Sequence, residues 1–320
     1  EGLKEEIIEA YEILDVDKGM MKNAREGGAL EILKTSHEPP FVAVRSSATA
    51  EDLADASFAG QQETFLNVKG KNELIEKVKR CFASLYTARA TYYREKKGFK
   101  HGETYLSVIV QKMVDSDKSG VIFSKNPVRN DDSILIESVY GLGEGIVSGR
   151  INPDSYVVKG TVEEFEIIEE SIGNKKIAIV RDSSGKNQII KLTEERSKQR
   201  VLSNYELKML AKYAQKLEKY YEKPQDIEFA IEGENIYIVQ SRPVTTLENK
   251  VDEAKIEGEA ILTGIGASPG IGSGIVKIVH SMDDLEKVEK GDILVTEMTN
   301  PDMVVTMQKA AAIVTDEGGI

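Results

Sequence analysis

The sequence predicts a mixed fold of the α+β or α/β class, and three observations support this. The chain has 320 residues, of which 40% are hydrophobic and 30% charged, a composition typical of folded globular proteins. Segments with helical spacing of apolar residues alternate with short runs rich in valine and isoleucine. A charged stretch, 248–259, separates a long first part from a short second one. We therefore expect two folded parts joined by a linker.

Amphipathic helices are expected in three segments of the first part. Their apolar residues recur at three- and four-residue spacing, which places them on one helical face. The segments are 3–14, 72–97 and 193–222. Cys81 lies on the apolar stripe of the second segment, so we expect it to pack as a small apolar residue.

Strands are expected where short apolar or alternating runs end at turn-forming residues. Such runs lie at 41–44, 64–68, 105–114, 120–123, 134–139, 226–231 and 235–240, with further strands inside 157–192 that break at 173–174 and 182–185. Strand patterns on both sides of Gly233 predict a hairpin there. The polar, glycine-containing stretch 45–62 is expected to be a loop.

The second part begins near residue 260 and has its own pattern of elements. A glycine-rich stretch comes first and is followed by three strand-like runs and one helical run. The glycine-rich stretch is 264–274, the strands are expected at 275–279, 293–296 and 311–314, and the helix at 282–288.

Charge and cysteine content restrict the partners and the compartment. The formal net charge of -12 at pH 7 opposes binding to phosphate backbones and anionic lipid, so neither nucleic acid nor a membrane is an expected partner. A single cysteine excludes an intramolecular disulfide and is typical of a reducing compartment, which predicts a cytoplasmic protein. No apolar run approaches the ~18 residues that a membrane helix needs.

An arginine with the chemistry of a phosphate ligand stands directly after the first strand signature. The string is VRSSATAED at 44–52, in which small hydroxylated residues and two acids follow Arg45. A guanidinium binds phosphate oxygens in a bidentate manner, and hydroxyls and loop amides add further donors. A salt bridge from Arg45 to Glu51 or Asp52 is the structural alternative, and composition alone would favour it.

A second group of polar residues lies on the hairpin around Gly233. Asp226 and Glu228 are two apart in a strand and therefore share a face. Two carboxylates on one face fit Mg²⁺, which prefers oxygen ligands and bridges to nucleotide phosphates. On the partner strand Gln240 adds a neutral oxygen, and Arg242 can neutralise charge on a transferred phosphate. For an isolated acid pair, a solvated edge hairpin is the competing interpretation.

Taken with their flanking residues, these strings resemble the phosphoenolpyruvate synthase and pyruvate phosphate dikinase family of PEP-utilising enzymes. The first part carries the resemblance in VRSSATAED at 44–52, DASFAGQQET at 55–64, ESVYGLGEG at 137–145, and DIEF at 226–229 with QSRP at 240–243. The second part carries it in TGIGASPG at 263–270 and TDEGG at 315–319. The motifs stand in the family's order and span nearly the whole chain.

The resemblance implies a domain organisation and a set of site residues. It implies an ATP-grasp nucleotide-binding domain at 1–247 that lacks its N-terminal portion, a linker at 248–259, and at 260–320 the start of a β/β/α swivelling phosphohistidine domain. It implies Mg²⁺ and ATP as ligands. The implied catalytic residues are Arg45 and Arg242; the implied ATP contacts are Arg45, Gly60, Gln62, Thr64, Glu137 and Arg242; and the implied metal ligands are Glu228 and Gln240, with Asp226 in support.

The resemblance also implies individual roles within this set, and side-chain chemistry is consistent with them. Gly60 would let backbone amides approach phosphate, while Gln62 and Thr64 offer side-chain donors or acceptors. Glu137 would lie near adenosine, where its carboxylate could accept hydrogen bonds from ribose hydroxyls. A helix cap or an ion pair with Arg150 is the alternative for Glu137.

The implied reaction makes phosphoenolpyruvate from pyruvate, ATP and water, in the gluconeogenic direction, and releases AMP and phosphate through a phosphohistidine intermediate. ATP, pyruvate and the remaining domains of the same enzyme are the implied partners, and a homo-oligomer is left open. One alternative is a pyruvate phosphate dikinase, in which phosphate replaces water as second acceptor. The other, of a different class, is an ATP-binding module without transfer activity.

We also expect the chain to be a fragment that is inactive alone. In the family a glycine-rich lysine loop precedes the arginine string, and the phosphate-carrying histidine follows TDEGG within a few residues, beyond Ile320. The three histidines present, His37, His101 and His280, lie outside that motif, so none is expected to replace the missing one.

Overall fold

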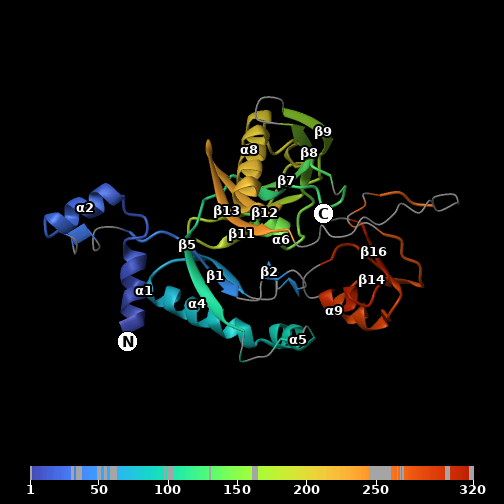
Figure 1. The fold of residues 1–320 in the computed structure, drawn as a ribbon, viewed down its shortest axis with the longest axis horizontal. Coiled ribbons are helices and arrows are strands. Elements are labelled where there is room, and N and C mark those ends of the chain that lie inside the picture. Colours follow the sequence, from blue (N-terminus) through green and yellow to red (C-terminus); the bar gives the residue numbers. More distant parts are fainter. Residues whose placement is uncertain are drawn as a thin grey trace. The chain divides into compact units, whose positions relative to one another are not determined.

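The computed structural model shows a chain of two compact units (Figure 1). It describes residues 2–29, 32–33, 38–48, 52–53, 56–57, 63–96, 98–99, 102, 104–129, 131–160, 165–244, 261–264, 266, 268, 270–299 and 303–316. The first unit comprises 1–114 with 181–187, and the second comprises 115–180 with 188–320. The predicted linker, 248–259, lies outside the described residues.

The first unit is built on a three-stranded antiparallel sheet of order β4-β1-β5. Its strands are β4 (Thr64–Val68), β1 (Val42–Ala48) and β5 (Leu106–Lys112). Helices α1 (Gly2–Glu12) and α4 (Lys71–Ala83) share one apolar core with one face of this sheet. The buried core residues are Tyr11, Val42, Val44, Val68, Leu74, Val78 and Cys81. Cys81 therefore packs as an apolar residue, as predicted.

Two predictions for the first unit were wrong in detail. The stretch 45–62 is not a loop throughout, because β1 continues to Ala48, paired along its whole length with β5, and β2 (Asp52–Leu53) pairs with β3 (Ala56–Ser57). The helix expected at 72–97 is split into α4, a 3-10 turn η1 (Ser84–Tyr86) and α5 (Ala88–Lys96). Thr87 has extended backbone, and its hydroxyl accepts from the Ala90 N–H, so it starts a new helix.

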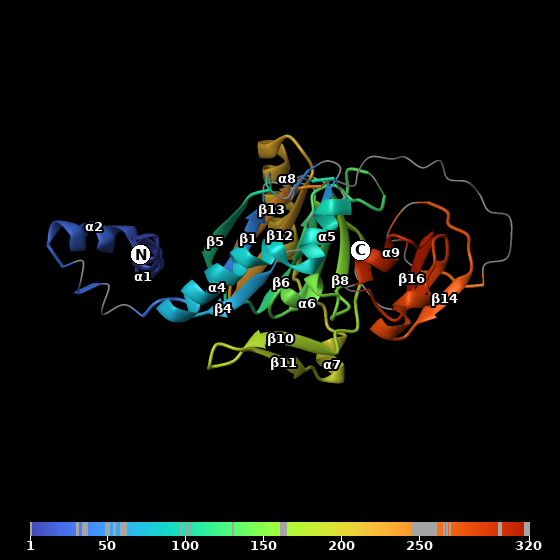
Figure 2. The ribbon, with the colours of Figure 1, turned by 90° about the horizontal axis from the view of Figure 1, so that it is seen from below.

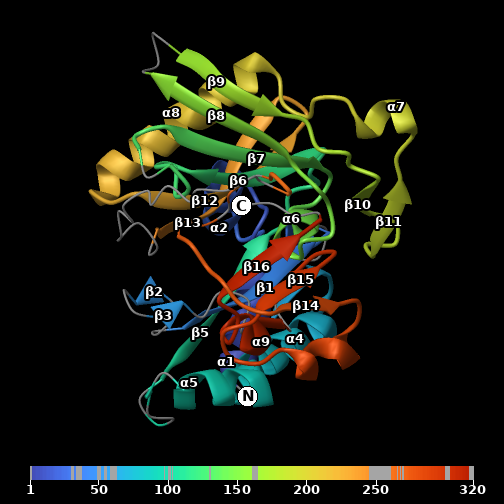
Figure 3. The ribbon, with the colours of Figure 1, turned by 90° about the vertical axis from the view of Figure 1, so that its right-hand side faces the viewer.

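The second unit contains a six-stranded antiparallel sheet of order β13-β12-β6-β7-β8-β9 (Figure 3). The strands are β6 (Lys118–Phe123), β7 (Ile134–Tyr140), β8 (Asp154–Gly160), β9 (Phe165–Ser171), β12 (Gln225–Glu232) and β13 (Asn235–Pro243). The predicted hairpin around Gly233 is confirmed by β12 and β13.

Helix α8 (Asn204–Tyr221) covers one face of this sheet. The core between them is formed by alternate residues of the strands and by the apolar face of the helix. It includes Ile122, Ile134, Ile136, Tyr156, Val158, Leu207, Leu210, Ala214, Ile227, Phe229 and Ile231. The opposite face of the sheet therefore carries the other alternate residues.

The helix predicted at 193–222 is two helices, α7 (Glu194–Ser197) and α8. Ser203 begins α8 with a capping box, in which its hydroxyl accepts from the Glu206 N–H and the Glu206 carboxylate accepts from the Ser203 N–H. Lys118 on β6 donates to both Glu206 oxygens, at 2.7 and 2.9 Å. The cap is thereby tied to the sheet that α8 covers.

Several smaller elements lie outside these two sheets. Helix α6 (Glu144–Val147) follows β7. Strands β10 (Ile177–Arg181) and β11 (Asn187–Lys191) form a separate two-stranded sheet (Figure 2), and the predicted turn at 182–185 lies between them. Its Asp182 carboxylate accepts from the Ser184 and Lys186 N–H groups.

The last part of the chain has a parallel sheet of order β14-β15-β16. Its strands are β14 (Val276–Val279), β15 (Ile293–Thr296) and β16 (Ala312–Thr315), which matches the predicted strands to within a residue at each end. The segment predicted as a helix at 282–288 is instead a 3-10 helix, η2 (Met282–Lys287), and α9 (Val304–Met307) follows β15. This part of the chain has a small hydrophobic core of its own, formed by Val279, Val288, Leu294 and Met303.

A buried carboxylate connects three segments of the second unit. Asp154 and Lys175 are both fully buried and form an ion pair. Asp154 Oδ1 also accepts from the Gly173 N–H at 3.0 Å, and Oδ2 accepts from the Tyr156 hydroxyl at 3.0 Å and the Val201 N–H at 2.7 Å. These bonds hold β8, the connection after β9, and the segment that leads into α8. The burial of two charges is offset here by a complete set of partners.

We predict that Asp154→Asn lowers the free energy of unfolding by about 3–5 kcal/mol, because Lys175 would keep its charge in a buried place without its counterion. Denaturant unfolding measures the change. Asp132→Asn is the control, since the Asp132 side chain is 93% exposed and 3.6 Å from Lys125. An Asp154 variant as stable as the control would contradict the structural role.

Tyr156 gives a second prediction, at alkaline pH. Burial, followed by the negative charge of Asp154, raises the pKa of the Tyr156 hydroxyl above its ordinary value of 10.0. Because the folded pKa exceeds the unfolded one, this stabilisation is complete below pH 10 and is lost as pH rises further. Above that pH we expect the stability advantage of the wild type over Tyr156→Phe to fall by about 1.4 kcal/mol per pH unit.

The measurement is urea unfolding of both proteins across the pH range. Below pH 10 the difference between the two proteins should be constant, which serves as the internal control. A difference that stays constant into the alkaline range would show that Tyr156 ionises alike in the folded and unfolded states.

Candidate functional site

Arg45 and Thr64 are neighbours on the sheet of the first unit. Arg45 on β1 is directly opposite Thr64 on β4 and Ile109 on β5. Val42 and Val44 point into the core, so Arg45 lies on the opposite face of the strand. Arg45 is half-buried, and Thr64 is exposed. This face therefore presents a guanidinium beside a hydroxyl, a pair suited to phosphate oxygens.

Other predicted residues of the first unit cannot be placed beside them. Gly60 and Gln62 lie outside the described residues, as does Glu51. The side chain of Asp52 is also outside them. The competing salt bridge from Arg45 to Glu51 or Asp52 thus involves acids whose side chains lie outside the described residues.

Three of the predicted residues of the second unit lie in one transverse row across the sheet. Gln240 on β13 pairs with Glu228 on β12, Glu228 with Val121 on β6, and Val121 with Glu137 on β7. Residues directly opposite each other in a sheet share a face. The two carboxylates and the amide therefore face the same way. We call these four residues the acidic row.

The acidic row lies on the face away from α8. Ile227 and Phe229, which flank Glu228, are buried in the core beneath α8, so Glu228 points to the other side. The predicted sharing of one face by Asp226 and Glu228 follows from the same alternation. With strands spaced about 4.8 Å apart, the Glu228 and Glu137 Cα atoms are separated by ~10 Å across Val121. Glu137 is only 3% exposed.

A β-bulge places Gln240 on this face. Glu228 pairs with Gln240 but Phe229 pairs with Ile238, so Val239 is an extra residue in β13. Ile238 is opposite Phe229, on the side of α8. In a regular strand Gln240 would share that side, because it is two residues from Ile238. The extra residue reverses the alternation and turns Gln240 toward Glu228.

Asp226 and Arg242 form the next transverse pair. They are directly opposite each other, and the Arg242 Nε donates to Asp226 Oδ2 at 2.8 Å while Nη2 lies 2.7 Å from the same oxygen. Two of the five guanidinium N–H groups are directed at Asp226 in this way, which fixes the orientation of the planar group. Asp226 thus contacts the arginine directly.

The donor atoms of the acidic row fit a magnesium ion. Gln240 Oε1 is enclosed, and no described residue donates a hydrogen bond to it, so the oxygen is available to a cation. Glu228, one strand away, supplies a carboxylate. Within the described part of the chain there is no cluster of three or more His, Cys, Asp or Glu side chains able to hold a metal. A site with few protein ligands suits Mg²⁺, which usually completes its shell with water and phosphate oxygens.

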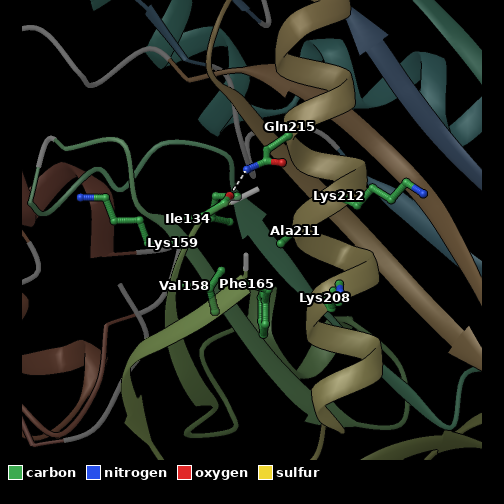
Figure 4. Close-up of a pocket in the computed structure, with 9 residues that line it drawn as sticks. Ile134, Val158, Lys159, Phe165, Lys208, Ala211, Lys212 and Gln215 are labelled. Carbon is green, nitrogen blue, oxygen red and sulfur yellow. Dashed lines mark hydrogen bonds between the residues drawn. The ribbon is translucent and has the colours of Figure 1, made fainter. Parts of the chain in front are cut away.

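A small pocket lies elsewhere in the second unit, against α8 (Figure 4). Lys159 and Lys212 point away from each other in this view, and the Gln215 amide donates to the Gly160 carbonyl at 2.6 Å. Because the lysine side chains diverge, they do not make an anion site. The pocket includes none of the predicted site residues.

Sequence reasoning missed two features of this site. It did not place Val121 between the two carboxylates, because the pairing of β6 with β12 joins distant segments of the chain. It also did not predict the bulge at Val239. The sequence did contain a signal for the bulge. Ile236 and Ile238 are apolar residues two apart, but Gln240, the next residue in this alternation, is polar.

A mixed α/β chain with an arginine and a hydroxyl on one sheet, and oxygen donors beside an oriented arginine on another, has the components of a nucleotide-binding phosphotransfer protein. Comparison with known families gives the assignment directly. The chain belongs to the family described as pyruvate phosphate dikinase, AMP/ATP-binding domain, which matches residues 3–261. The mobile domain of PEP-utilising enzymes matches residues 288–320.

Individual relatives agree with the family match. A probable phosphoenolpyruvate synthase of Archaeoglobus fulgidus is 54% identical over 286 residues, covering 88% of this chain and 38% of that protein. The phosphoenolpyruvate synthase of Pyrococcus furiosus is 52% identical over 296 residues, covering 88% and 36%. That of Helicobacter pylori is 43% identical over 346 residues, covering 99% and 40%.

These matches confirm the resemblance drawn from the motifs. The chain spans 36–40% of the length of these three relatives. None of the helices in the described ranges is both long and apolar enough to cross a membrane.

The enclosed Gln240 oxygen generates a prediction about stability and binding together. Gln240→Leu should raise the free energy of unfolding of the metal-free protein by about 1–3 kcal/mol, because it removes a buried acceptor to which no described residue donates. We expect Mg²⁺ with ATP to stabilise the unaltered protein but not this variant. Thermal unfolding with and without Mg²⁺ and ATP measures both effects.

Gln215→Leu on α8 is the control, and it should keep the full shift with Mg²⁺ and ATP. If Gln240→Leu kept that shift as well, the amide would not be a ligand.

Proposed function

We propose that this chain supplies Mg²⁺ and ATP binding to a longer phosphotransferase that makes phosphoenolpyruvate from pyruvate, ATP and water. AMP and phosphate are the other products. The names of the relatives support the reaction, and the nucleotide-binding family supports the use of ATP. The structural observation that carries the proposal is the acidic row, in which Glu228 is paired with Gln240, whose enclosed oxygen accepts no hydrogen bond from any described residue.

The proposal includes the domain organisation that the motifs imply. Residues 1–247 form an ATP-grasp domain, 248–259 a linker, and 260–320 the start of a swivelling phosphohistidine domain. The mixed α/β sheets and the two family matches support this division. The remaining domains of the same protein then provide the histidine and the pyruvate site.

Each residue has a proposed part in binding. Arg45 and Thr64 contact phosphate, together with Gly60 and Gln62. Glu137 accepts from the ribose hydroxyls, and its burial strengthens such hydrogen bonds. Glu228 and Gln240 hold Mg²⁺, which when bound neutralises negative charge on the phosphate oxygens. Arg242, oriented by Asp226, directs its remaining donors at the phosphate that is transferred.

These side chains act by position and charge. None of them forms a covalent bond to substrate in the proposed mechanism. Phosphoryl transfer places charge on the equatorial phosphate oxygens, and fixed cationic donors stabilise that charge without reorganising. The ion pair of Arg242 with Asp226 matters here because it restricts the guanidinium before the nucleotide arrives.

Two other functions differ from this one in measurable ways. A pyruvate phosphate dikinase would need added phosphate and would form pyrophosphate. An ATP-binding module would bind Mg²⁺ and ATP but release no AMP. Phosphorus NMR of the full-length protein with ATP and pyruvate, with and without phosphate, separates the three. AMP formed without added phosphate supports the synthase; a strict need for phosphate overturns it in favour of the dikinase.

We predict that Arg45→Ala in the full-length protein reduces AMP formation at least a hundredfold, because a charge-assisted phosphate contact is lost where charge develops. Arg80→Ala in the same unit is the matched control, since Arg80 lies on α4 with a half-exposed side chain. Circular dichroism checks that both variants fold. Normal AMP formation by the Arg45 variant would remove this residue from the mechanism.

A further inference from the structure

The hairpin that carries Asp226 and Arg242 ends in a pair whose two members share no backbone hydrogen bond, because the Gln225 N–H and carbonyl are both bonded to Ser124 on the β6 side. Gln225 is directly opposite Pro243, and proline has no N–H to donate. Two other bonds close this end. The Val244 N–H donates to the Pro224 carbonyl at 2.9 Å, and the Ser241 hydroxyl donates to Gln225 Oε1 at 2.8 Å.

Gln225 is buried, and both its backbone and its side chain are hydrogen-bonded. It is 1% exposed. Its backbone N–H donates to Ser124 Oγ at 2.8 Å, and its carbonyl accepts from the Ser124 N–H at 2.9 Å, which fixes it to the end of β6. Its side-chain Nε2 donates to the Lys223 and Pro224 carbonyls at 3.0 and 3.3 Å. The side chain thus joins the entry of β12 to the exit of β13.

The bond between Ser241 and Gln225 lies directly beneath the Asp226–Arg242 pair. Gln225 precedes Asp226 and Ser241 precedes Arg242, so these side chains point to the opposite face from the pair. Together with the backbone bond from Val244 to Pro224, this side-chain bond limits how far Arg242 can move relative to Asp226. A loss of this bond would loosen the arginine without removing any atom that faces the nucleotide.

We propose that Gln225 is a positioning residue for Arg242: its buried amide, bonded to Ser241, holds the end of β13 so that the Arg242 guanidinium keeps the orientation needed for phosphoryl transfer. The inference rests on the proposed function, in which Arg242 stabilises charge on the transferred phosphate. It assigns no contact with nucleotide or metal to Gln225 itself.

The test uses Gln225→Met in the full-length enzyme, because methionine keeps the length of the side chain and removes its hydrogen bonds. The matched control is Gln215→Met, which removes the amide bond from α8 to the Gly160 carbonyl at the end of β8. For both variants kcat, KM for ATP and Tm are measured, in the wild-type background and in an Arg242→Ala background.

We expect Gln225→Met to lower kcat about tenfold with KM for ATP within twofold, since a misplaced catalytic group reduces the rate more than binding. In the Arg242→Ala background the same change should lower Tm by the same amount and leave kcat where Arg242→Ala alone puts it. Gln215→Met should lower Tm without changing kcat in either background.

Two results would overturn the inference, each for a different reason. If Gln225→Met lowers kcat by the same factor with and without Arg242, it does not act through that arginine and the inference is overturned. If Arg242→Ala has wild-type kcat, the proposed role of Arg242 fails and the inference fails with it, while Arg45→Ala still tests the wider function.

A milder pair of variants covers the case in which Gln225→Met does not fold. Ser241→Ala removes only the hydroxyl that bonds to Gln225, whereas Ser241→Thr keeps it in a residue that strands favour. Ser241→Ala should lower kcat severalfold, and Ser241→Thr should restore it. Equal kcat for the two Ser241 variants would overturn the inference.

Discussion

The second unit depends on a carboxylate that has no contact with solvent. Asp154 accepts four hydrogen bonds, from Lys175, Gly173, Tyr156 and Val201. It joins the start of β8 to the connections that precede β10 and α8. A buried ion pair contributes little net stability against an apolar replacement, but the loss of one partner is costly. The pair therefore acts as a constraint on which segments can meet, and it brings the entry to α8 onto the sheet.

The fixed position of α8 decides which face of the sheet remains for function. One set of alternate residues fills the core under the helix. The other set contains Gln240, Glu228 and Glu137 in one row, and Arg242 with Asp226 in the next. Val121 separates the two carboxylates by a full strand, which reduces their mutual repulsion. The strand register therefore determines which of these polar side chains are neighbours.

Much of this arrangement could be predicted from the sequence, and the failures have clear causes. The alternation in 226–229 placed Asp226 and Glu228 on one face correctly. Apolar spacing continues through Thr87 and through 198–203, so the helices were predicted as unbroken. The capping signature Ser203-x-x-Glu206 was present in the sequence and marks the true start of α8. The prediction relied on apolar spacing alone, whereas the capping signature should have been used to place the start of the helix.

Other features depend on contacts between distant segments. The extension of β1 through Arg45 to Ala48 requires β5, which supplies a partner for each of these residues. The acidic row requires β6 beside β12, and a single sequence does not specify this pairing. The bulge at Val239 turns Gln240 to the face of Glu228, and it becomes visible only when the pairing of β12 with β13 is known. Residue chemistry therefore identified the candidate groups, and sheet topology determined which of them meet.

The strand order also has a consequence for synthesis on the ribosome. Strands β6 to β9 leave the ribosome first, with one edge of β6 unpaired until β12 follows. An open strand edge can pair with other chains, so the interval between the emergence of β9 and of β12 is the period when the nascent chain is most exposed to misassembly. Because Gln240 comes from β13, the last strand of the sheet to be made, the proposed site for Mg²⁺ and ATP is complete only after the sheet is complete. Binding would then stabilise completed sheets selectively over unfinished ones.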